Sequence, residues 1–355
     1  MTSAPADWAA ETRRVLEENP DLPRAAQAAL LGIKTRQLQI RIAHHMKDLS
    51  KPIGAQPSGV VEPLPELPVF PDDDMPPENL IDTLCTRFDR RYAADKAKEW
   101  FTIKMPDDRP FALACFGDPH LDSNGCNWPR LRADCKTVAD TPGMYGLDVG
   151  DVVDGWGTRL MRLYAHSDQS TETAWRLVDW FYNHSGVQFL VRILGNHDQM
   201  RMDVPEVLKR ICKNNVPVFA DEAKFVLKTP NGFEAPVWCR HQFSGNSMWN
   251  RLHGMQKAAM MKQAAGLYIC GHIHTWALHH EENAERGFVY WLARARGYKF
   301  IDDYAKRLGF AEQQYGATIV AVYNPQAESE PARLQCYADV QQAAEYLTWL
   351  RERYQ

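Results

Sequence analysis

The hydrophobic and polar positions of the chain fall into three stretches with different periodicity. Residues 7–49 carry apolar side chains at helical spacing, and residues 52–77 show no period and contain eight prolines. From Phe111 onward, short apolar runs alternate with helical patterns, which is typical of a layered α/β domain. The proline-rich stretch is typical of a stiff linker. We therefore predict a helical unit at 1–50, a linker at 51–77 and an α/β domain at 78–355.

Particular helices and strands follow from this division. Gly32 suits a tight turn and Thr35 suits the start of a helix. The helices expected in the amino-terminal part are Trp8–Glu18, Pro23–Leu31 and Thr35–Leu49. Apolar runs of four to six residues predict strands at Phe111–Phe116, Phe189–Leu194, Pro236–Arg240 and Leu267–Cys270. Helical patterns predict helices at Glu78–Phe101, Ala133–Asp140, Thr171–His184, Pro205–Asn214 and Asp339–Tyr354.

Composition indicates a globular protein outside the membrane. The chain has 355 residues, of which 45% are apolar and 24% charged, and no apolar run approaches the roughly 20 residues that a membrane helix needs. No secretory signal is visible at the start, and the eight cysteines lack a paired spacing. Both features favour a cytoplasmic protein with reduced thiols and no membrane partner. The net charge of −4 argues against a protein that coats nucleic acid, but does not exclude a local basic surface.

Side chains that bind metals follow several of the strand-like runs. Four segments each begin at a glycine and present Asp, Asn or His: Gly117–His120, Gly150–Asp154, Gly195–Asp198 and Gly271–His274. A single His241 ends a further run. Open α/β sheets bind their ligands at the carboxyl ends of the strands. We therefore expect these segments to converge on one site.

The donor types indicate the class of metal. Asp and His with an Asn carbonyl, and no Cys, suit manganese, iron or zinc rather than an iron–sulfur cluster. Asp118 and His120 lie two residues apart, so on an extended strand end their side chains share one side and can hold one ion. His272 and His274 can do the same from a turn. Asp151 is placed to bridge two ions, and the second ion is completed by Asn196 and His241.

The order DxH, GDxxD, GNHD, single His and GHxH resembles the calcineurin-like metallophosphoesterase superfamily, over about residues 111–300. That superfamily includes protein phosphatases, cyclic-nucleotide phosphodiesterases and the SbcD-type nucleases. The resemblance implies a four-layer α/β/β/α sandwich, preceded here by the small all-α unit. It also implies a catalytic centre of two divalent metal ions about 3.5–4 Å apart.

Residue roles follow from this resemblance. One ion would be held by Asp118, His120, Asp151 and His274, and the other by Asp151, Asn196, His241 and His272. His241 precedes Gln242 where the superfamily usually has glycine, so His253 is the alternative ligand. His197 would meet the leaving group as a general acid, and Asp198 would orient its ring. For Asp154 we favour a helix cap or a residue behind the ligands over a direct ligand.

The segment from Ala25 to Leu38 resembles a helix-turn-helix of the Fis type. Its last helix carries a run of polar and cationic residues without an acid before Asp48. Side chains in such a helix can contact bases or phosphates in a major groove. The DNA contacts expected are Lys34, Arg36, Gln37 and Arg41. The alternative is a three-helix unit that binds protein or helps assembly.

The function favoured by these features is metal-dependent phosphodiester hydrolysis of DNA, with manganese as the expected metal. The run from Arg240 to Met261 resembles calcineurin-like proteins encoded by tailed bacteriophages, which are often labelled exonucleases; this resemblance would place the protein in the host cytoplasm. Segments 246–251 and 294–299 mix cations with aromatics and either hold nucleic acid or form a solvated face over core aromatics. One alternative is a phosphomonoesterase acting on phosphoproteins or nucleotides. Another is a DNA-binding regulator whose metal domain is vestigial.

Overall fold

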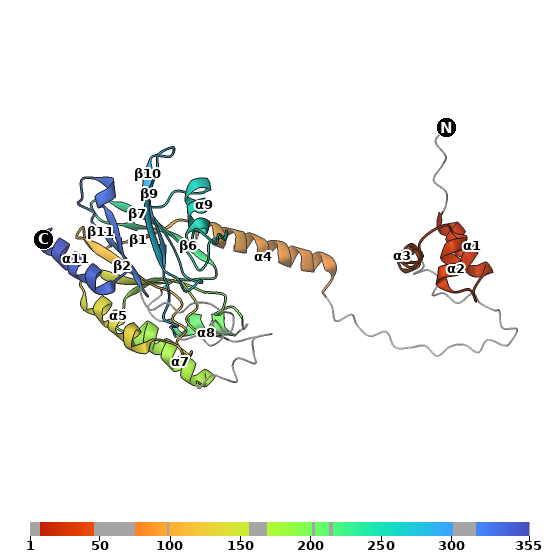
Figure 1. Ribbon diagram of the computed structural model, residues 1–355, viewed down its shortest axis with the longest axis horizontal. Helices are drawn as coiled ribbons and strands as arrows, with labels where there is room; N and C mark the ends of the chain where they lie inside the picture. The colour runs from red at the N-terminus through yellow and green to blue at the C-terminus, as the bar shows by residue number, and fades with distance from the viewer. Residues whose placement is uncertain are drawn as a thin grey trace. The chain divides into compact units, whose positions relative to one another are not determined.

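The computed structural model describes residues 8–45, 75–97, 99–155, 169–200, 203–212, 216–300 and 317–354. The chain divides into two compact units, Met1–Asp74 and Met75–Gln355 (Figure 1). The linker predicted at 51–77 lies, up to residue 74, outside the described residues. No helix in the described ranges is long and apolar enough to cross a membrane.

The first unit contains three helices, at the predicted places: α1 (Trp8–Glu18), α2 (Arg24–Leu30) and α3 (Thr35–His45). Gly32 makes the turn between α2 and α3 with a φ of 65°, a conformation that favours glycine. Val15, Ala28 and Leu38 are buried, so each helix contributes to a small apolar core. The predicted continuation of α3 to Leu49 lies outside the described residues.

The second unit begins with helix α4 (Pro77–Ala97), followed by strand β1 (Phe101–Lys104). The prediction of one helix through Phe101 is therefore wrong at its end. Trp100 has a φ of 56°, which no helix accommodates, and Phe101 pairs with Phe225 in a parallel ladder. The ring of Phe101 also stacks on Phe219 at 5.3 Å between centroids. The apolar side chain of Phe101 thus packs in a sheet rather than in a helix.

β1 and the other described strands form two six-stranded sheets. The first sheet has the order β12-β11-β2-β3-β4-β5, with β2 (Phe111–Phe116), β3 (Met144–Asp148), β4 (Phe189–Ile193), β5 (Val218–Phe219), β11 (Ile319–Tyr323) and β12 (Leu334–Tyr337). The second sheet has the order β1-β6-β7-β8-β10-β9, with β6 (Glu222–Lys228), β7 (Glu234–Arg240), β8 (Leu267–Cys270), β9 (Ala277–Asn283) and β10 (Phe288–Arg294). All four predicted strands are present.

The two sheets pack face to face and helices cover their outer faces (Figure 1). Between the sheets, Leu113 and Val191 of the first belong to the same buried cluster as Val237 and Ile269 of the second. The first sheet's outer face carries α5 (Trp128–Asp140), α7 (Thr171–Asp179), α8 (Val204–Ile211) and α11 (Val340–Arg353). The second sheet's outer face carries α9 (His253–Met261). The predicted four-layer α/β/β/α sandwich is confirmed.

Two short helical elements complete the described part, η3 (Trp180–His184) and η4 (Glu330–Ala332). The predicted helix Thr171–His184 is divided, because α7 passes into a single π-helical stretch at η3.

Strand direction determines where the chemistry lies. β2, β3 and β4 run parallel to one another, as do β7, β8 and β10. The carboxyl ends of β2, β3 and β4 therefore lie at one edge of the first sheet, and those of β7 and β8 at one edge of the second. All five candidate metal segments directly follow these strands.

Candidate metal centre

The backbone of the candidate ligands is unusual. Residues other than glycine rarely adopt positive φ, and such strain clusters at functional sites. Among the described residues, six non-glycine residues have positive φ, and five of them are candidate metal ligands. These five are Asp118 (45°), His120 (45°), Asp151 (56°), His272 (72°) and His274 (20°), and the sixth is Trp100. The expectation that Asp118 and His120 lie on an extended strand end is therefore wrong: both have a left-handed backbone conformation in the loop that follows β2.

Glycine at the start of two segments is explained by lack of space. A Cβ atom at Gly195 would collide with the carboxylate of Asp151, and a Cβ atom at Gly271 would collide with the carboxylate of Asp118. The carboxylates can thus lie directly against the neighbouring backbone. The pairing of glycine with a following donor, visible in the sequence, reflects this close packing.

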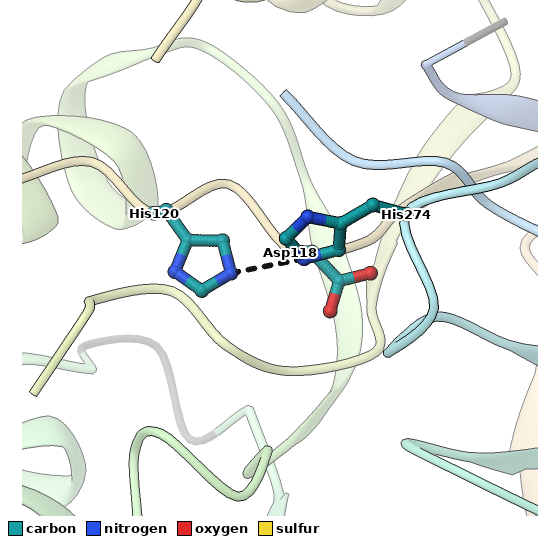
Figure 2. A group of neighbouring side chains, drawn as sticks. All are labelled: Asp118, His120 and His274. Carbon is teal, nitrogen blue, oxygen red and sulfur yellow. Dashed lines mark hydrogen bonds between the residues drawn. The ribbon is translucent and has the colours of Figure 1, made fainter. Parts of the chain in front are cut away.

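A first donor group consists of Asp118, His120 and His274, whose ligand atoms all lie within 4.8 Å of one another (Figure 2). The Nε2 atoms of His120 and His274 are 3.2 Å apart. Asp118 and His120 are buried. Two imidazole nitrogens that approach each other beside a carboxylate are a typical arrangement for a divalent cation.

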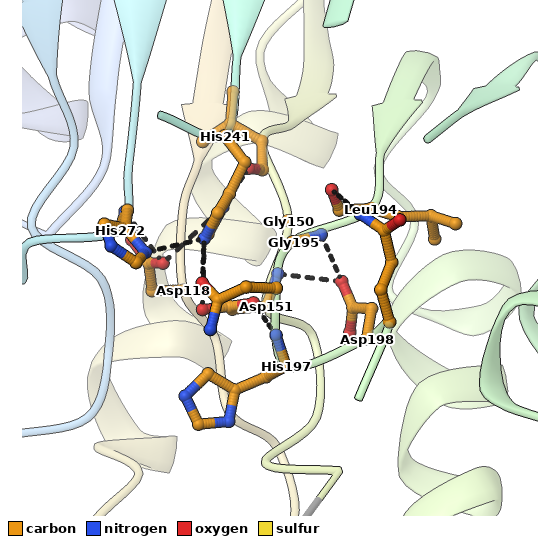
Figure 3. A network of polar contacts seen from close by, with 12 residues as sticks. Asp118, Gly150, Asp151, Leu194, Gly195, His197, Asp198, His241 and His272 are labelled. Atoms are coloured by element: carbon orange, nitrogen blue, oxygen red, sulfur yellow. Dashed lines mark hydrogen bonds and ion pairs between the residues drawn. The ribbon is translucent and has the colours of Figure 1, made fainter. Parts of the chain in front are cut away.

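A second donor group consists of Asp151, His241 and His272 (Figure 3). The Nε2 atom of His241 lies 3.2 Å from Asp151 Oδ2 and 3.1 Å from His272 Nδ1. It also lies 3.0 Å from Asn196 Oδ1, so the predicted amide donor joins the group. His253 begins α9 and is exposed, and it belongs to none of the donor groups found among the described residues. The geometry therefore favours His241 over His253.

The donors fit divalent ions in number and type. Together the two groups offer carboxylate, amide and imidazole atoms, the oxygen and nitrogen ligands preferred by manganese, iron and zinc. The structure places Asp151 in the second group. Its expected position as a bridge between two ions stays a prediction.

Asp198 has a different place from the one expected. One of its carboxylate oxygens accepts hydrogen bonds from the backbone N–H groups of Asp151 and Gly195, both at 2.8 Å, and the other accepts from Val152 at 3.1 Å. The side chain is fully buried. Asp198 thus ties together the turns after β3 and β4, and the expectation that it orients the ring of His197 is corrected. Because all of these donors are backbone N–H groups, the carboxylate of Asp198 fixes the backbone of the two loops and not the ring of His197.

The ring of His197 is held by the backbone of Asp154. Its Nδ1 donates to the carbonyl oxygen of Asp154 at 2.6 Å, and Figure 3 shows the ring directed away from Asp198. The ring lies edge-on to that of His120, with 5.0 Å between centroids. The backbone N–H of His197 donates to Asp151 Oδ1 at 2.8 Å. The predicted acid is therefore next to both donor groups.

Asp154 lies behind a ligand, as the sequence analysis favoured. Its Oδ1 atom is 2.8 Å from Nδ1 of His120 and 2.9 Å from Nζ of Lys299. The two atoms lie within ion-pair distance, but burial lowers the pKa of His120, so its ring is neutral at neutral pH and the contact is a polar one. Carboxylates behind metal-bound histidines orient the ring and raise its basicity.

Lys299 was missed by the sequence analysis. Segment 294–299, expected as a nucleic-acid surface or a solvated face, is instead buried. No local pattern in the sequence identifies the contact, because Lys299 and Asp154 are 145 residues apart. Segment 246–251, in contrast, is largely exposed, with Met248 at 87% and Trp249 at 91% exposure.

Two histidines of the second donor group have opposite pKa shifts. Burial lowers the pKa of His272 to about 4, and the neighbouring His241 contributes to the decrease. Burial also opposes charge on His241, but the carboxylates of Asp151 and Asp118 outweigh it and raise its pKa to about 10. Without metal at neutral pH, His272 is therefore neutral and His241 carries a proton.

Metal binding to the second group is expected to release a proton. A metal-bound imidazole is neutral, so at pH 7 to 8 an ion must displace the proton of His241. Because the pKa of His241 is raised to about 10, apparent affinity should rise about tenfold per pH unit below that pKa. Calorimetric titration with Mn²⁺ in buffers of different ionisation enthalpy measures the release. His241→Asn should abolish it and the exposed His253→Asn should not; equal release in both variants would contradict the assignment.

Three of the four predicted DNA contacts are exposed, and the fourth is half-buried. Lys34, Arg36 and Gln37 are exposed at the start of α3, where Gln37 Oε1 accepts from the backbone N–H of Lys34 at 3.1 Å. Arg41 is half-buried and donates to Thr12 Oγ1 at 3.2 Å, so it links α3 to α1. The first three form the surface that remains a candidate for DNA.

Comparisons with known proteins show only distant similarity. No protein-family model matches the chain, and no curated protein matches it. Among solved structures, the calcineurin-like phosphoesterase YfkN from Bacillus subtilis is 11% identical over 68% of this chain and 99% of its own, with a TM-score of 0.37. The NAD nucleotidase NadN from Haemophilus influenzae is 10% identical over 64% of this chain and 49% of its own, with a TM-score of 0.39. The Pseudomonas putida nuclease MPE is 13% identical over 63% and 87%, with a TM-score of 0.28. Similarities at this level do not decide the activity.

Proposed function

We propose that this chain is a phosphoester hydrolase of the calcineurin-like type that uses two divalent metal ions. The observation that supports the proposal most directly is the convergence of two Asp/His donor groups at adjoining sheet edges. A histidine outside the two groups, His197, lies beside them, with its ring edge-on to that of His120 and its backbone N–H on Asp151. Metal donors for two ions with an adjacent acid are the parts that two-metal hydrolases require.

The residues of the chain have separate tasks in this proposal. Asp118, His120 and His274 would hold one ion, Asn196, His241 and His272 would hold the other, and Asp151 would contribute to both. When bound, the ions neutralise the phosphate oxygens and lower the pKa of a coordinated water. The loops after β3 and β4, which carry Asp151 and Asn196, are joined by the hydrogen bonds of Asp198, so these two donors are held in a fixed relation to each other.

His197 supplies the proton for the leaving group. Its Nδ1 keeps a proton because it donates to the carbonyl of Asp154. Nε2 is then the atom that exchanges a proton with the leaving oxygen. An alkoxide such as the 3′ or 5′ oxygen of a nucleotide is a poor leaving group and gains most from this proton.

The substrate we propose is DNA, cut with manganese as the metal. Support comes from the exposed Lys34, Arg36 and Gln37 of the amino-terminal unit and from the exposed Trp249 on the loop that follows β7. Exposed cations bind phosphates, and exposed aromatic rings stack on unpaired bases. A nuclease acting on the backbone of DNA would use both.

One assay panel tests this proposal. Purified protein with Mn²⁺ is given bis-p-nitrophenyl phosphate, p-nitrophenyl phosphate, single-stranded DNA and duplex DNA. We expect hydrolysis of the diester and of DNA, with slower release from the monoester. Faster turnover of the monoester with intact DNA would indicate a phosphomonoesterase instead. No turnover of any substrate, together with DNA binding, would favour a regulator.

Removing the amino-terminal unit should separate DNA binding from hydrolysis. A chain that begins at Pro77 contains the whole second compact unit except Met75 and Pro76. It should hydrolyse a small phosphodiester at close to the full rate. It should also bind long duplexes more weakly, with a shallower salt dependence because phosphate contacts are lost.

A substitution in the full-length chain provides the matched comparison. Lys34→Ala with Arg36→Ala changes only exposed side chains, whereas a change at Arg41 would also break its contact with Thr12. Fluorescence anisotropy with labelled duplexes at several salt concentrations measures the DNA affinity of the truncated chain and of this double variant. Unchanged DNA binding in the two would mean that the helical unit serves a protein partner or assembly.

A further inference from the structure

Behind the first donor group lies a buried ion pair. Nζ of Lys299 is 2.9 Å from Oδ1 of Asp154, and the two residues are only 9% and 5% exposed. The same oxygen lies 2.8 Å from Nδ1 of His120. One carboxylate oxygen therefore lies between a lysine ammonium and the ring of a candidate metal ligand.

The backbone around Lys299 is fixed against the turn that carries Asp118. Gly297 has a φ of 92°, and a Cβ atom there would collide with Cβ and the carbonyl oxygen of Asp118. The N–H of Tyr298 donates to that same carbonyl at 3.1 Å, and the carbonyl of Tyr298 accepts from the N–H of Asn127 at 2.8 Å. The two residues before Lys299 are thus fixed against neighbouring backbone, which limits where the side chain of Lys299 can lie.

Asp154 contacts two functional histidines through different atoms. Its carboxylate faces His120, and its carbonyl oxygen accepts from Nδ1 of His197 at 2.6 Å. Its N–H donates to Oδ1 of Asp122 at 2.6 Å. A movement of Asp154 would therefore shift the candidate ligand and the candidate acid together.

The ammonium determines how the carboxylate of Asp154 behaves. A buried carboxylate without a positive partner is strongly unfavourable. It would then take up a proton or turn toward a bound cation. A third group of donors, His120, Asp154 and His197, lies within 4.8 Å, so a carboxylate released from Lys299 has a place where it could bind metal directly. Lys299 supplies positive charge beside this group.

We propose that Lys299 is a positioning residue of the metal centre, whose ammonium holds Asp154 against His120 and His197 and away from the ions. The inference rests on the proposed hydrolase function. It concerns a residue outside all five segments that carry the candidate ligands.

The test compares four variants of the full-length protein: Lys299→Met, Lys299→Arg, Lys299→Met with Asp154→Asn, and Lys228→Met as a control. Lys228 also pairs with a carboxylate, Glu234 at 2.7 Å, but on the surface. Calorimetric titration of metal-free protein with Mn²⁺ is the first measurement. Turnover of bis-p-nitrophenyl phosphate and the thermal unfolding midpoint are the second and third.

Lys299→Met should weaken one of the two Mn²⁺ binding steps and lower kcat, each by about 10–100-fold, the usual effect of losing support behind a metal ligand. KM should stay the same, because Lys299 is buried and in this proposal acts through Asp154 rather than on the substrate. Lys299→Arg should recover part of both losses, and Lys228→Met should resemble the wild type.

The double variant distinguishes positioning from a purely structural role. It leaves no unpaired charge, so its unfolding midpoint should recover while the weakened Mn²⁺ step and low kcat persist. Recovery of all three would overturn the proposal, as would wild-type Mn²⁺ binding by Lys299→Met. If Lys299→Met fails to fold, the double variant gives the same decision. A wild-type protein that binds two Mn²⁺ ions without hydrolysis would contradict the proposed function, and the Mn²⁺ titrations would still decide the role of Lys299.

Discussion

Chelation with EDTA is expected to abolish hydrolysis, and Mn²⁺ is expected to restore it. Asp151→Asn should be the most damaging substitution of a single ligand. The carboxylate of Asp151 uses both oxygens, one 3.2 Å from His241 Nε2 and the other accepting from the N–H of His197 at 2.8 Å. In the proposed centre Asp151 would help to hold both ions, so a neutral amide would weaken both binding steps.

Metal analysis and steady-state rates measure this prediction. Asp140→Asn is a suitable control, because Asp140 is an exposed carboxylate at the end of α5. Active protein that contains no transition metal, with a rate unaffected by EDTA, would exclude the two-metal proposal. An Asp151→Asn variant as active as the control would remove Asp151 from the centre.

His197→Ala is expected to lower kcat by about 10²–10⁴-fold, the usual contribution of a general acid. Metal content and substrate affinity should stay close to those of the wild type, because His197 is not among the donors assigned to the two ions. The loss should be smaller for p-nitrophenolate, which leaves without a proton, than for a nucleotide alkoxide. Rates on both types of diester therefore measure the role directly.

The matched control for this substitution is His184→Ala. His184 is exposed on η3 and pairs with Asp179, and its removal should leave both rates unchanged. Equal losses by His197→Ala on good and poor leaving groups would remove the acid role. A loss of bound metal in that variant would instead make His197 a ligand.

The convergence of the candidate metal donors could be predicted from the sequence, because each donor belongs to a recognisable local pattern. A short apolar run, a glycine and a donor occur together at Gly117–His120 and at Gly271–His274, and a carboxyl strand end gives that pattern a fixed place in a sheet. β3 was harder to find, because Tyr145, Gly146 and Asp148 interrupt its apolar pattern. The segment that follows it was still identified from its glycine and carboxylates.

Other features depend on contacts between distant parts of the chain. The role of Asp198 depends on backbone N–H groups up to 47 residues away, so its adjacency to His197 in sequence was misleading. The strand at Phe101 forms because β6 is available to pair with it, which no local period reveals. Positive φ at Asp118 and His120 likewise occurs where their N–H groups donate to carbonyl oxygens of the distant loop after β3, at Gly150 and Asp151.

The two donor groups each draw on both sheets. Asp118 and His120 follow β2 of the first sheet, whereas His274 follows β8 of the second. Asp151 follows β3, and its partners His241 and His272 follow β7 and β8. Each bound ion would therefore act as a cross-link between the sheets. Ligand binding stabilises a folded protein by about 2.7 kcal/mol at a hundredfold excess over Kd. The concentration of free metal would then affect the stability of the folded sandwich as well as its rate of catalysis.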